Sequence, residues 1–380
     1  MNWIWQQPDW PDFRHDNRAL NDRELEFRLN SERLAGSFDA LPMASQEDAT
    51  IDLMLCEAIK TSAIEGEDLD RESVRSSLLS LITSDTLPDN SDQKAAGAAS
   101  LLVDVRKNWQ TPLTHDLLGK WQSMAVPEQR YTSIMRGAYR NDPSPMQIVS
   151  GPYGREKVHY EAPPATQVPD EMAKLIDWYN QASPLSGDKT IHGIARAGIA
   201  HLWFGVIHPF DDGNGRVGRA IADHALSQFL GYPTTACLAT AIEGEKTYYL
   251  QLEKASRGSL DVNVWLDYFA DTIITAQEIA RQEVDFVLAK TRFYEAYGDQ
   301  LNDRQARMVS RIFAEGRKGF EGGITTKKYE SITKCPNRTA SRDLSDLVAK
   351  GIIIPLPGGG RTTRYELTIV EPAQSGLMRK

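Results

Sequence analysis

Apolar side chains recur every three or four positions along most of this chain, and that spacing predicts helices. Such a spacing places the apolar residues on one face of an α-helix, where they can pack against a core. Ile51, Leu55 and Ile59 are one example, and Leu25 with Leu29 is another. Together with start and stop signals, the spacing predicts helices over 22–37, 45–61, 69–82, 92–109, 115–124, 190–206 and 216–230, with further helices between 169 and 292.

Residues 139–164 break this pattern. Prolines and glycines crowd the segment, and a short strand-like run, Lys157–Glu161, precedes Pro163 and Pro164. Such a texture is typical of a loop that holds a short β-hairpin. We therefore predict a mainly α fold with a hairpin beside the helices.

The segment 295–380 has the pattern of a separate unit. Three short helices are predicted there, followed by two strand-like runs with a glycine-rich link: 303–314, 325–331, 337–350, 352–354 and 364–367. Three helices and a β-hairpin are the outline of a winged helix-turn-helix. The helix that begins near Asn337 is basic, so DNA is a candidate partner of residues 295–380; contact with another protein is the alternative.

The composition excludes several classes of protein. Hydrophobic residues make up 41% of the chain, and its formal net charge of -9 provides no overall attraction to nucleic acid. Cys56, Cys237 and Cys335 are far apart, so neither a disulfide framework nor a zinc site is expected. The sequence has no run of the ~20 apolar residues that span a bilayer, and its start lacks the features of a signal peptide. We expect a cytoplasmic protein with no membrane partner.

Candidate chemistry is concentrated between the predicted helices 190–206 and 216–230. Gly213–Gly215 can form a turn with positive φ at a helix N-terminus, which favours anions. Arg216 and Arg219 are three positions apart, so they share one helix face beside that turn. Asp212 supplies a carboxylate of the kind that binds Mg²⁺ on phosphates, and His208 is a base near neutral pH. These residues predict a site for phosphate chemistry.

The segment His208–Arg219 matches the pattern His-x-Phe-x-Asp/Glu-Gly-Asn-Gly-Arg-x-x-Arg at every fixed position. With each residue type near one in twenty, chance agreement is about 1 in 10¹⁰ per starting position. The segment thus resembles the signature of the Fic (Fido) family. A Gly-x-Gly-x-x-Gly fingerprint for dinucleotides also begins at Gly213, but that motif follows a strand, and here a helix precedes it.

The resemblance implies a Fic-type helical core over 92–290. Such a core moves AMP from ATP to a Ser, Thr or Tyr hydroxyl of a protein, or of the chain itself, and releases pyrophosphate. By resemblance His208 takes the hydroxyl proton, Phe210 anchors the loop and Asp212 holds Mg²⁺. The residues implied to contact the phosphates of ATP are Asp212, Gly213, Asn214, Gly215, Arg216 and Arg219.

The family also has a β-hairpin, the flap, over its site. The residues that resemble it, and that are expected to lie against ATP, are Val158, His159, Tyr160 and Glu161. A protein target would dock here as an added strand; an ordinary surface hairpin is the alternative. Further along, Tyr248 resembles a tyrosine that contacts the adenine, with a plain core aromatic as the alternative. Ser256 stands where some relatives have asparagine.

A second signature lies upstream. Thr61–Gly66 matches the inhibitory pattern Ser/Thr-x-x-x-Glu-Gly/Asn of Fic chains. By resemblance Glu65 pairs with Arg219 and occupies the site of the γ-phosphate. The alternative is a solvated carboxylate among its acidic neighbours.

These observations predict three domains. Residues 1–85 form an N-terminal helical module with the inhibitory motif, 92–290 the Fic core, and 295–380 a winged helix-turn-helix domain. The expected function is an autoinhibited protein adenylyltransferase that uses Mg-ATP, and a homodimer is expected by resemblance. The rival functions are a DNA-binding regulator whose core senses nucleotide, and an enzyme of the same fold that removes AMP.

Overall fold

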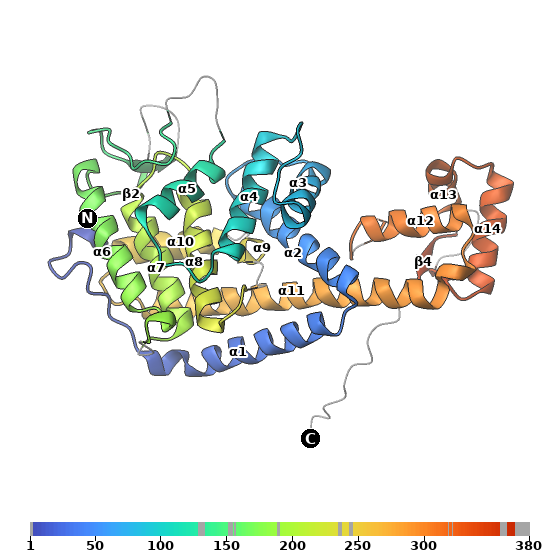
Figure 1. Cartoon of the computed structure of the whole chain (residues 1–380), viewed down its shortest axis with the longest axis horizontal. Coiled ribbons are helices and arrows are strands. Elements are labelled where there is room, and N and C mark those ends of the chain that lie inside the picture. The colour runs from blue at the N-terminus through green and yellow to red at the C-terminus, as the bar shows by residue number, and fades with distance from the viewer. Residues whose placement is uncertain are drawn as a thin grey trace. The chain divides into compact units, whose positions relative to one another are not determined.

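The computed structural model describes residues 3–127, 134–150, 155, 157–187, 191–234, 238–242, 246–317, 319–320, 322–357 and 363–368. It is mainly helical, as predicted (Figure 1). Its contacts form two compact units, 1–36 with 50–281 and 37–49 with 282–380, so the boundary falls inside α1, α2 and α11. The division at 85, 92, 290 and 295 stays a prediction. No helix among the described residues is long and apolar enough to cross a membrane.

The helices match the predicted segments closely. The helices that cross the boundary between the units are α1 (Asn17–Asp39), α2 (Met43–Ile64) and α11 (Asn263–Tyr297). The helices that lie within the first unit are α3 (Arg71–Thr83), α4 (Gln93–Lys107), α5 (His115–Ala125), α6 (Val168–Gln181), α7 (Gly193–Ile207), α8 (Asn214–Leu230), α9 (Leu238–Ile242) and α10 (Lys246–Arg257). Local signals set their ends. Asp70, for example, caps α3 by accepting a hydrogen bond from the Ser73 N–H at 2.8 Å.

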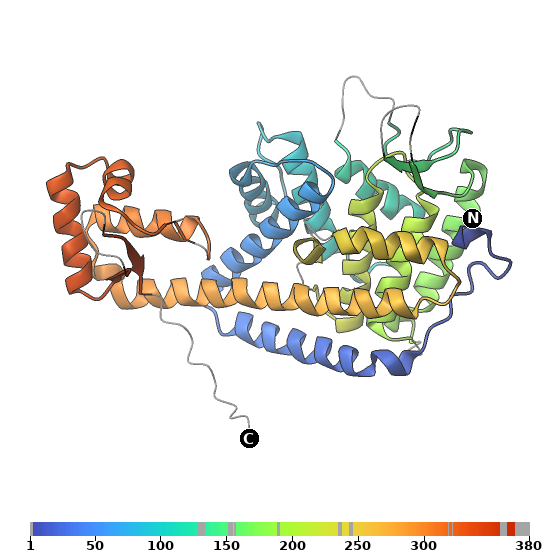
Figure 2. The same ribbon diagram turned by 180° about the vertical axis from the view of Figure 1, so that it is seen from behind.

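Helix α7 lies at the centre of the first unit, beside α8 (Figure 1 and Figure 2). The sequence pattern assigned it one apolar face, but nearly every side chain from Gly193 to Ile207 is buried. A helix that is apolar all round belongs inside a core. Gly198 permits this packing, because a Cβ there would lie 2.7 Å from Leu266. The candidate loop that follows α7 therefore starts from the most rigid part of the fold.

Helix α1 buries a part of its predicted apolar pattern, Phe27 with Leu34, and leaves the other part exposed. Leu25 and Leu29 are 57% and 47% exposed, whereas Phe27 is fully buried. The buried face also holds Glu24, whose carboxylate accepts the N–H groups of Gly193 and Ile194 at 3.1 and 3.2 Å. This carboxylate satisfies free donors at the N-terminus of α7, so a polar residue occupies a core position.

The predicted hairpin is present as β1 (Gln147–Ser150) and β2 (Lys157–Glu161), which pair antiparallel with a bulge between Ile148 and Val149. The tryptophan-rich start of the chain, with a short 3-10 turn at Ile4–Gln6, packs against β2 and α7. The Trp5 indole N–H donates to the Glu161 carbonyl at 2.8 Å, and Trp10 meets the Trp203 ring at 5.9 Å. This arm ties the hairpin to the core.

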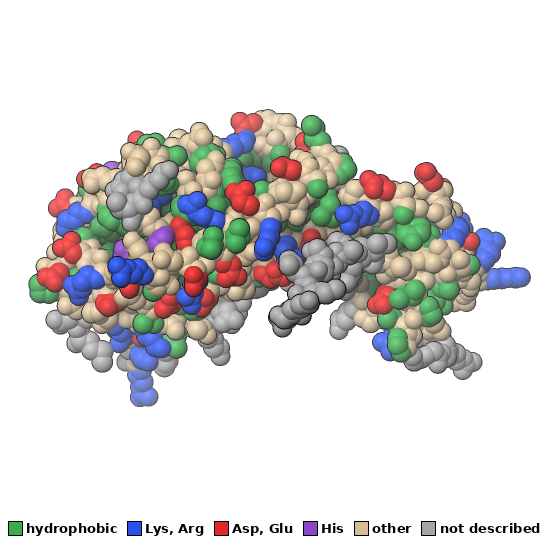
Figure 3. Space-filling model, turned by 90° about the horizontal axis from the view of Figure 1, so that it is seen from below, with side chains coloured by type: hydrophobic (Ala, Val, Ile, Leu, Met, Phe, Trp, Pro, Cys, Tyr) green, Lys and Arg blue, Asp and Glu red, His purple; other side chains and the backbone are tan. Residues whose placement is uncertain are grey.

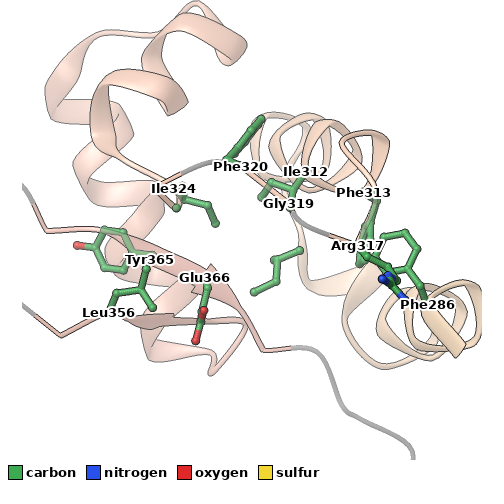
Figure 4. A pocket seen from close by; sticks show the side chains of 13 residues that line it. Phe286, Ile312, Phe313, Arg317, Gly319, Phe320, Ile324, Leu356, Tyr365 and Glu366 are labelled. Atoms are coloured by element: carbon green, nitrogen blue, oxygen red, sulfur yellow. The ribbon is translucent and has the colours of Figure 1, made fainter. Parts of the chain in front are cut away.

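The second unit contains the elements predicted for residues 303–367. They are α12 (Asp303–Ala314), α13 (Thr326–Thr333), α14 (Asn337–Ala349) and the antiparallel pair β3 (Ile353–Pro355) and β4 (Tyr365–Leu367). Figure 4 shows a pocket of about 200 Å³ in this unit, with Phe286 and Phe313 on one side and Ile324 and Tyr365 on the other. The element order fits a winged helix-turn-helix, and that assignment stays a prediction.

Candidate active site

The loop between α7 and α8 takes its shape from two residues in the left-handed region. His208 ends α7 with φ 49°, and its N–H donates to the Phe204 carbonyl at 3.0 Å. Gly213 precedes α8 with φ 86°, where a Cβ would lie 2.8 Å from Val126. A left-handed histidine is uncommon and is held by its surroundings, which is typical of functional positions.

Asn214 holds this loop closed. Its side-chain oxygen accepts the Phe210 N–H at 3.0 Å, and its amide donates to the Phe210 carbonyl at 2.7 Å. Phe210 is fully buried and lies 5.4 Å from the Tyr139 ring. Asn214 was expected to contact phosphate, yet in this structure its side chain serves the loop. Phe210 is the anchor that the resemblance implied.

Arg140 is a functional residue that the sequence analysis missed. It is buried, and its guanidinium donates to the carbonyls of His208 at 2.8 Å, Ile207 at 3.3 Å and Pro163 at 2.5 Å. Its own N–H donates to the Pro209 carbonyl at 2.9 Å. Arg140 therefore positions the backbone that carries His208. No signal in the sequence could reveal it, because its partners lie up to 69 positions away along the chain.

Replacing Arg140 with alanine should destabilise the protein by about 2–4 kcal/mol, because buried carbonyls would lose a charged donor. Thermal unfolding measures this loss. Arg140→Lys keeps the charge but not the planar fork of donors, so it should recover a part of the stability. An unchanged melting temperature in Arg140→Ala would contradict the positioning role.

The His208 imidazole is held neutral. It is half-buried, and burial lowers its pKa to about 4, helped by the nearby Arg140 cation. A neutral imidazole can accept a proton throughout the physiological pH range. The residue therefore has the protonation state that a general base needs.

The N-terminus of α8 faces a cluster of charged groups. Arg216 and Arg219 are both buried, and the helix leaves its first N–H groups without helical acceptors. The Arg219 guanidinium lies 2.8 Å from a Glu65 oxygen and donates to the Thr61 hydroxyl at 2.8 Å. A Cβ on Gly215 would lie 2.2 Å from the Glu65 carboxylate, so Glu65 sits directly on the turn. The structure brings together the two arginines, the glycine turn and Glu65, as predicted.

A further carboxylate lies on this face. Glu67 pairs with Arg216 at 2.8 Å through one oxygen and with Lys94 of α4 at 3.1 Å through the other. Glu65 and Glu67, which follow α2, can both reach α8 because Gly66 between them has φ 76°. The sequence analysis gave Glu67 no role, so this pair is a finding of the structure.

Asp212 is the candidate magnesium ligand. It is exposed, and one of its oxygens accepts the Gly213 N–H at 2.6 Å. Among the described residues, no three His, Cys, Asp or Glu side chains lie close enough to hold an ion by themselves. A single carboxylate fits Mg²⁺ that takes its other ligands from phosphates and water. The donor set is therefore compatible with Mg-ATP, whose phosphates would have to complete it.

A pocket of about 430 Å³ opens next to the loop, between the hairpin, the end of α7 and α10. Its walls include Ile148, His159, Gly205, Leu252 and Ser256. The lining is mostly apolar with a few polar groups, which is typical of sites for flat organic ligands such as a nucleobase. The pocket adjoins the last turn of α7, immediately before His208.

Tyr248 does not line this pocket, and its neighbour Tyr249 does. Tyr248 is buried, and its hydroxyl lies 2.6 Å from Nε2 of His201. Tyr249 is 53% exposed, and its hydroxyl donates to the Ile64 carbonyl at 3.4 Å. The burial of Tyr248 fits the alternative of a core aromatic, Tyr249 lines the pocket, and the contact of Tyr248 with the adenine stays a prediction.

The four flap residues have different surroundings. His159 and Tyr160 line the pocket, and the Tyr160 hydroxyl donates to the Val206 carbonyl. The Val158 and His159 carbonyls accept hydrogen bonds from Arg257 at 3.1 and 2.7 Å. Glu161 is bound by the N-terminal arm and by Gln147, outside the lining of the pocket. The structure thus brings two of the four to the candidate site.

Two family models match parts of this chain. The model described as "Fic/DOC family" matches residues 112–226, which include the whole loop and most of α8. Residues 112–226 are therefore similar to the Fic/DOC family. A "Domain of unknown function (DUF4172)" matches residues 3–82, which carry Glu65 and Glu67.

Several known proteins resemble a part of this chain. A "Probable protein adenylyltransferase" of Aquifex aeolicus is 32% identical over 27% of this chain and 28% of its own length. "Protein adenylyltransferase fic-1" of Caenorhabditis elegans is 34% identical over 24% of this chain and 17% of its own. A "Uridine 5'-monophosphate transferase" of Xanthomonas campestris is 27% identical over 38% of this chain and 27% of its own. The matches thus span less than a third of each relative.

A solved structure shares the fold. The Fic domain containing signaling protein from Bacteroides thetaiotaomicron has a TM-score of 0.51 and 18% identity, over 67% of this chain and 96% of that one. This likeness supports the Fic fold, while the chemistry depends on the residues described above.

Proposed function

We propose that this chain is an autoinhibited nucleotidyltransferase that moves AMP from Mg-ATP to a Ser, Thr or Tyr hydroxyl of a protein. One observation carries the proposal. His208, whose pKa burial lowers to about 4, lies at the end of α7. The loop that follows it leads to the N-terminus of α8, where Arg216 and Arg219 are buried, and a pocket of about 430 Å³ lies beside the last turn of α7. Proton acceptor, phosphate site and base site are what this transfer requires. Two of the relatives are named protein adenylyltransferases, which supports the same activity for this chain.

In the proposed reaction, His208 accepts the proton of the target hydroxyl. The hydroxyl oxygen bonds to the α-phosphorus of ATP, the bond from that phosphorus to the β-phosphate breaks, and pyrophosphate leaves with the electron pair. Arg216, Arg219 and the α8 N–H groups neutralise the phosphates, and Mg²⁺ held by Asp212 would add positive charge there. Phosphoryl-type transfer depends on such alignment and charge neutralisation.

The Glu65–Arg219 pair supports the autoinhibited part of the proposal. The Glu65 carboxylate binds the Arg219 guanidinium, which the γ-phosphate of ATP would need. The two anions therefore compete for the same cation. Transfer therefore requires that Glu65 moves away. Removal of AMP from a modified protein is the second candidate, since the same groups can hold a phosphodiester and a water molecule.

The decisive experiment uses the Glu65→Gly protein with Mg²⁺ and α-labelled ATP, alone and with cell lysate. Mass spectrometry of labelled proteins would report the transferred group and its attachment site. We expect a mass increase of one AMP on a hydroxyl side chain. Labelling by UTP in preference to ATP would reassign the nucleotide, and release of AMP from a modified substrate without transfer would favour the second candidate.

A further inference from the structure

The exposed face of α14 carries two arginines, Arg338 and Arg342, which have no acidic partner outside the unit among the described residues. The buried positions of α14 are Ala340, Asp343, Leu344 and Leu347. The residues on the opposite side of the helix point away from the core and are exposed: Asn337, Arg338, Ser341, Arg342 and Ser345. The second acid of the helix, Asp346, has a side chain that is 45% exposed, but it is already paired with Lys350 at 2.6 Å.

This helix is held rigidly by the rest of the second unit. The buried Asp343 carboxylate accepts hydrogen bonds from Arg304 of α12 at 2.7 Å and from the Tyr329 hydroxyl of α13 at 3.1 Å. Gln305 of α12 also donates to the Asp343 carbonyl at 3.1 Å. The Asp343 charge is thus paired inside the unit, while Arg338 and Arg342 are exposed; Arg342 lies 4.0 Å from an Asp343 oxygen and its side chain is 75% exposed.

Neighbouring elements extend the positive surface. Lys327 and Lys334 of α13 and Arg364 beside β4 are exposed. Figure 3 shows Lys and Arg side chains standing out on the right, over the part of the second unit formed by α13 and α14. The full chain is acidic, with a formal net charge of -9, so this concentration is local.

We propose that residues 282–368 bind double-stranded DNA, with the outer face of α14 in the major groove. An exposed helix fits that groove, arginine and asparagine can read guanine and adenine edges there, and the flanking lysines can contact phosphates. This activity is separate from nucleotide transfer, and neither family match reaches these residues.

Fluorescence anisotropy with the full chain and a labelled duplex of random sequence tests the proposal at about 50 and about 200 mM salt. Arg338→Ala/Arg342→Ala should weaken binding at least tenfold and reduce the salt slope by about two, because two phosphate or base contacts are lost. Arg14→Ala/Arg281→Ala removes two exposed arginines of the first unit and should bind like the wild type.

Two results would overturn the proposal. One is the absence of binding at the lower salt concentration. The other is a single-stranded DNA or RNA of equal length that binds as tightly as the duplex, since a helix in the major groove requires paired strands. His208→Ala should leave duplex binding unchanged, which keeps this test independent of the transfer reaction.

A separate observation concerns the proposed transfer site, and the inference from it rests on the proposed function. Glu67 is bound on both sides, by Arg216 at 2.8 Å and by Lys94 at 3.1 Å, and its side chain is 17% exposed. The N–H groups of Glu65 and Glu67 share the Ser62 carbonyl as acceptor, at 3.0 and 2.9 Å. One turn after α2 thus delivers two carboxylates to two arginines of α8.

We infer that Glu67 is a second inhibitory carboxylate, which holds the β-phosphate site through Arg216 while Glu65 holds the γ-phosphate site through Arg219. Lys94 anchors Glu67 from α4, so the second contact is fixed independently of Glu65. Full opening of the site then requires the movement of both acids.

Binding of Mg-ADP and Mg-ATP by calorimetry separates the two acids without any transfer. Glu67→Ala should tighten both ADP and ATP binding by about tenfold, since a charged competitor for Arg216 is removed. Glu65→Ala should tighten ATP binding more than ADP binding. Asp68→Ala removes an exposed acid of the same turn and should change neither.

Unchanged ADP affinity in Glu67→Ala, with tighter ATP binding in Glu65→Ala, would overturn the role of Glu67 and leave the proposed function intact. No nucleotide binding by any variant would overturn both.

Discussion

Glu65→Gly is expected to raise AMP labelling at least about tenfold over the wild-type chain. The wild-type carboxylate lies 2.8 Å from the Arg219 guanidinium and on top of the Gly215 turn. Charged hydrogen bonds of this kind contribute about 1.5–3 kcal/mol, which corresponds to roughly ten- to hundredfold in occupancy. Autoradiography of self-labelling and of labelling in lysate, with α-labelled ATP, measures the change.

Two controls make this result specific. Asp68→Gly places the same flexible residue in the same turn but removes an exposed acid, so it should label like the wild type. Glu65→Gln keeps the length of the side chain and removes its charge, so it should be activated in part. Equal labelling by wild type, Glu65→Gly and Asp68→Gly would remove the inhibitory assignment.

The helices and the reactive loop were predictable because their signals are local. Asp70 caps α3 through a residue three positions away, and the His208–Arg219 segment carries its loop residues and both arginines together. In a contiguous motif, helix geometry alone brings Arg216 and Arg219 to one face. The sequence therefore predicted the mainly α fold and the centre of the site.

The residues that support the site were not predictable because their partners are distant in sequence. Gln122 reaches the Asp212 carbonyl at 3.2 Å and accepts the Gly137 N–H at 2.6 Å. Arg140 joins the carbonyls of His208 and Pro163, and Glu24 caps a helix that begins 169 positions later. Such side chains look like ordinary surface residues until the tertiary fold buries them.

The differences from the predicted pattern have the same origin. Leu25 and Leu29 have helical spacing, yet α1 buries the face with Phe27 and Leu34, and Glu24 on that face accepts N–H groups at the N-terminus of α7. Tyr248 and Tyr249 are adjacent, so they point to different sides of α10, and the position of the hairpin decides which of them meets the pocket. The spacing of residues along a helix predicts which of them share a face, whereas the elements packed against that face decide what those residues do.

His208→Ala should lower AMP transfer by about 10²–10⁴ in a Glu65→Gly background, which is the usual contribution of a general base. ATP binding should persist, because the arginines and α8 N–H groups that hold the phosphates are unchanged. Calorimetry for ATP and labelling for transfer separate the two effects. His15→Ala, in a histidine that bonds to Asn17 at 3.0 Å, serves as the control and should keep full activity.

The pH dependence tests the same role in the intact histidine. Burial lowers the His208 pKa to about 4, so the proton-accepting form is present above that pH and is lost as the pH falls through it. Transfer by Glu65→Gly should therefore stay nearly constant from about pH 8 to about pH 6. A histidine with an ordinary pKa near 6.5 would instead lose about half of its activity at about pH 6.5 and about three quarters at about pH 6. A profile that halves near pH 6.5 would show that the imidazole becomes solvated when Glu65 is removed, and retention of full transfer in His208→Ala would assign the base to another group.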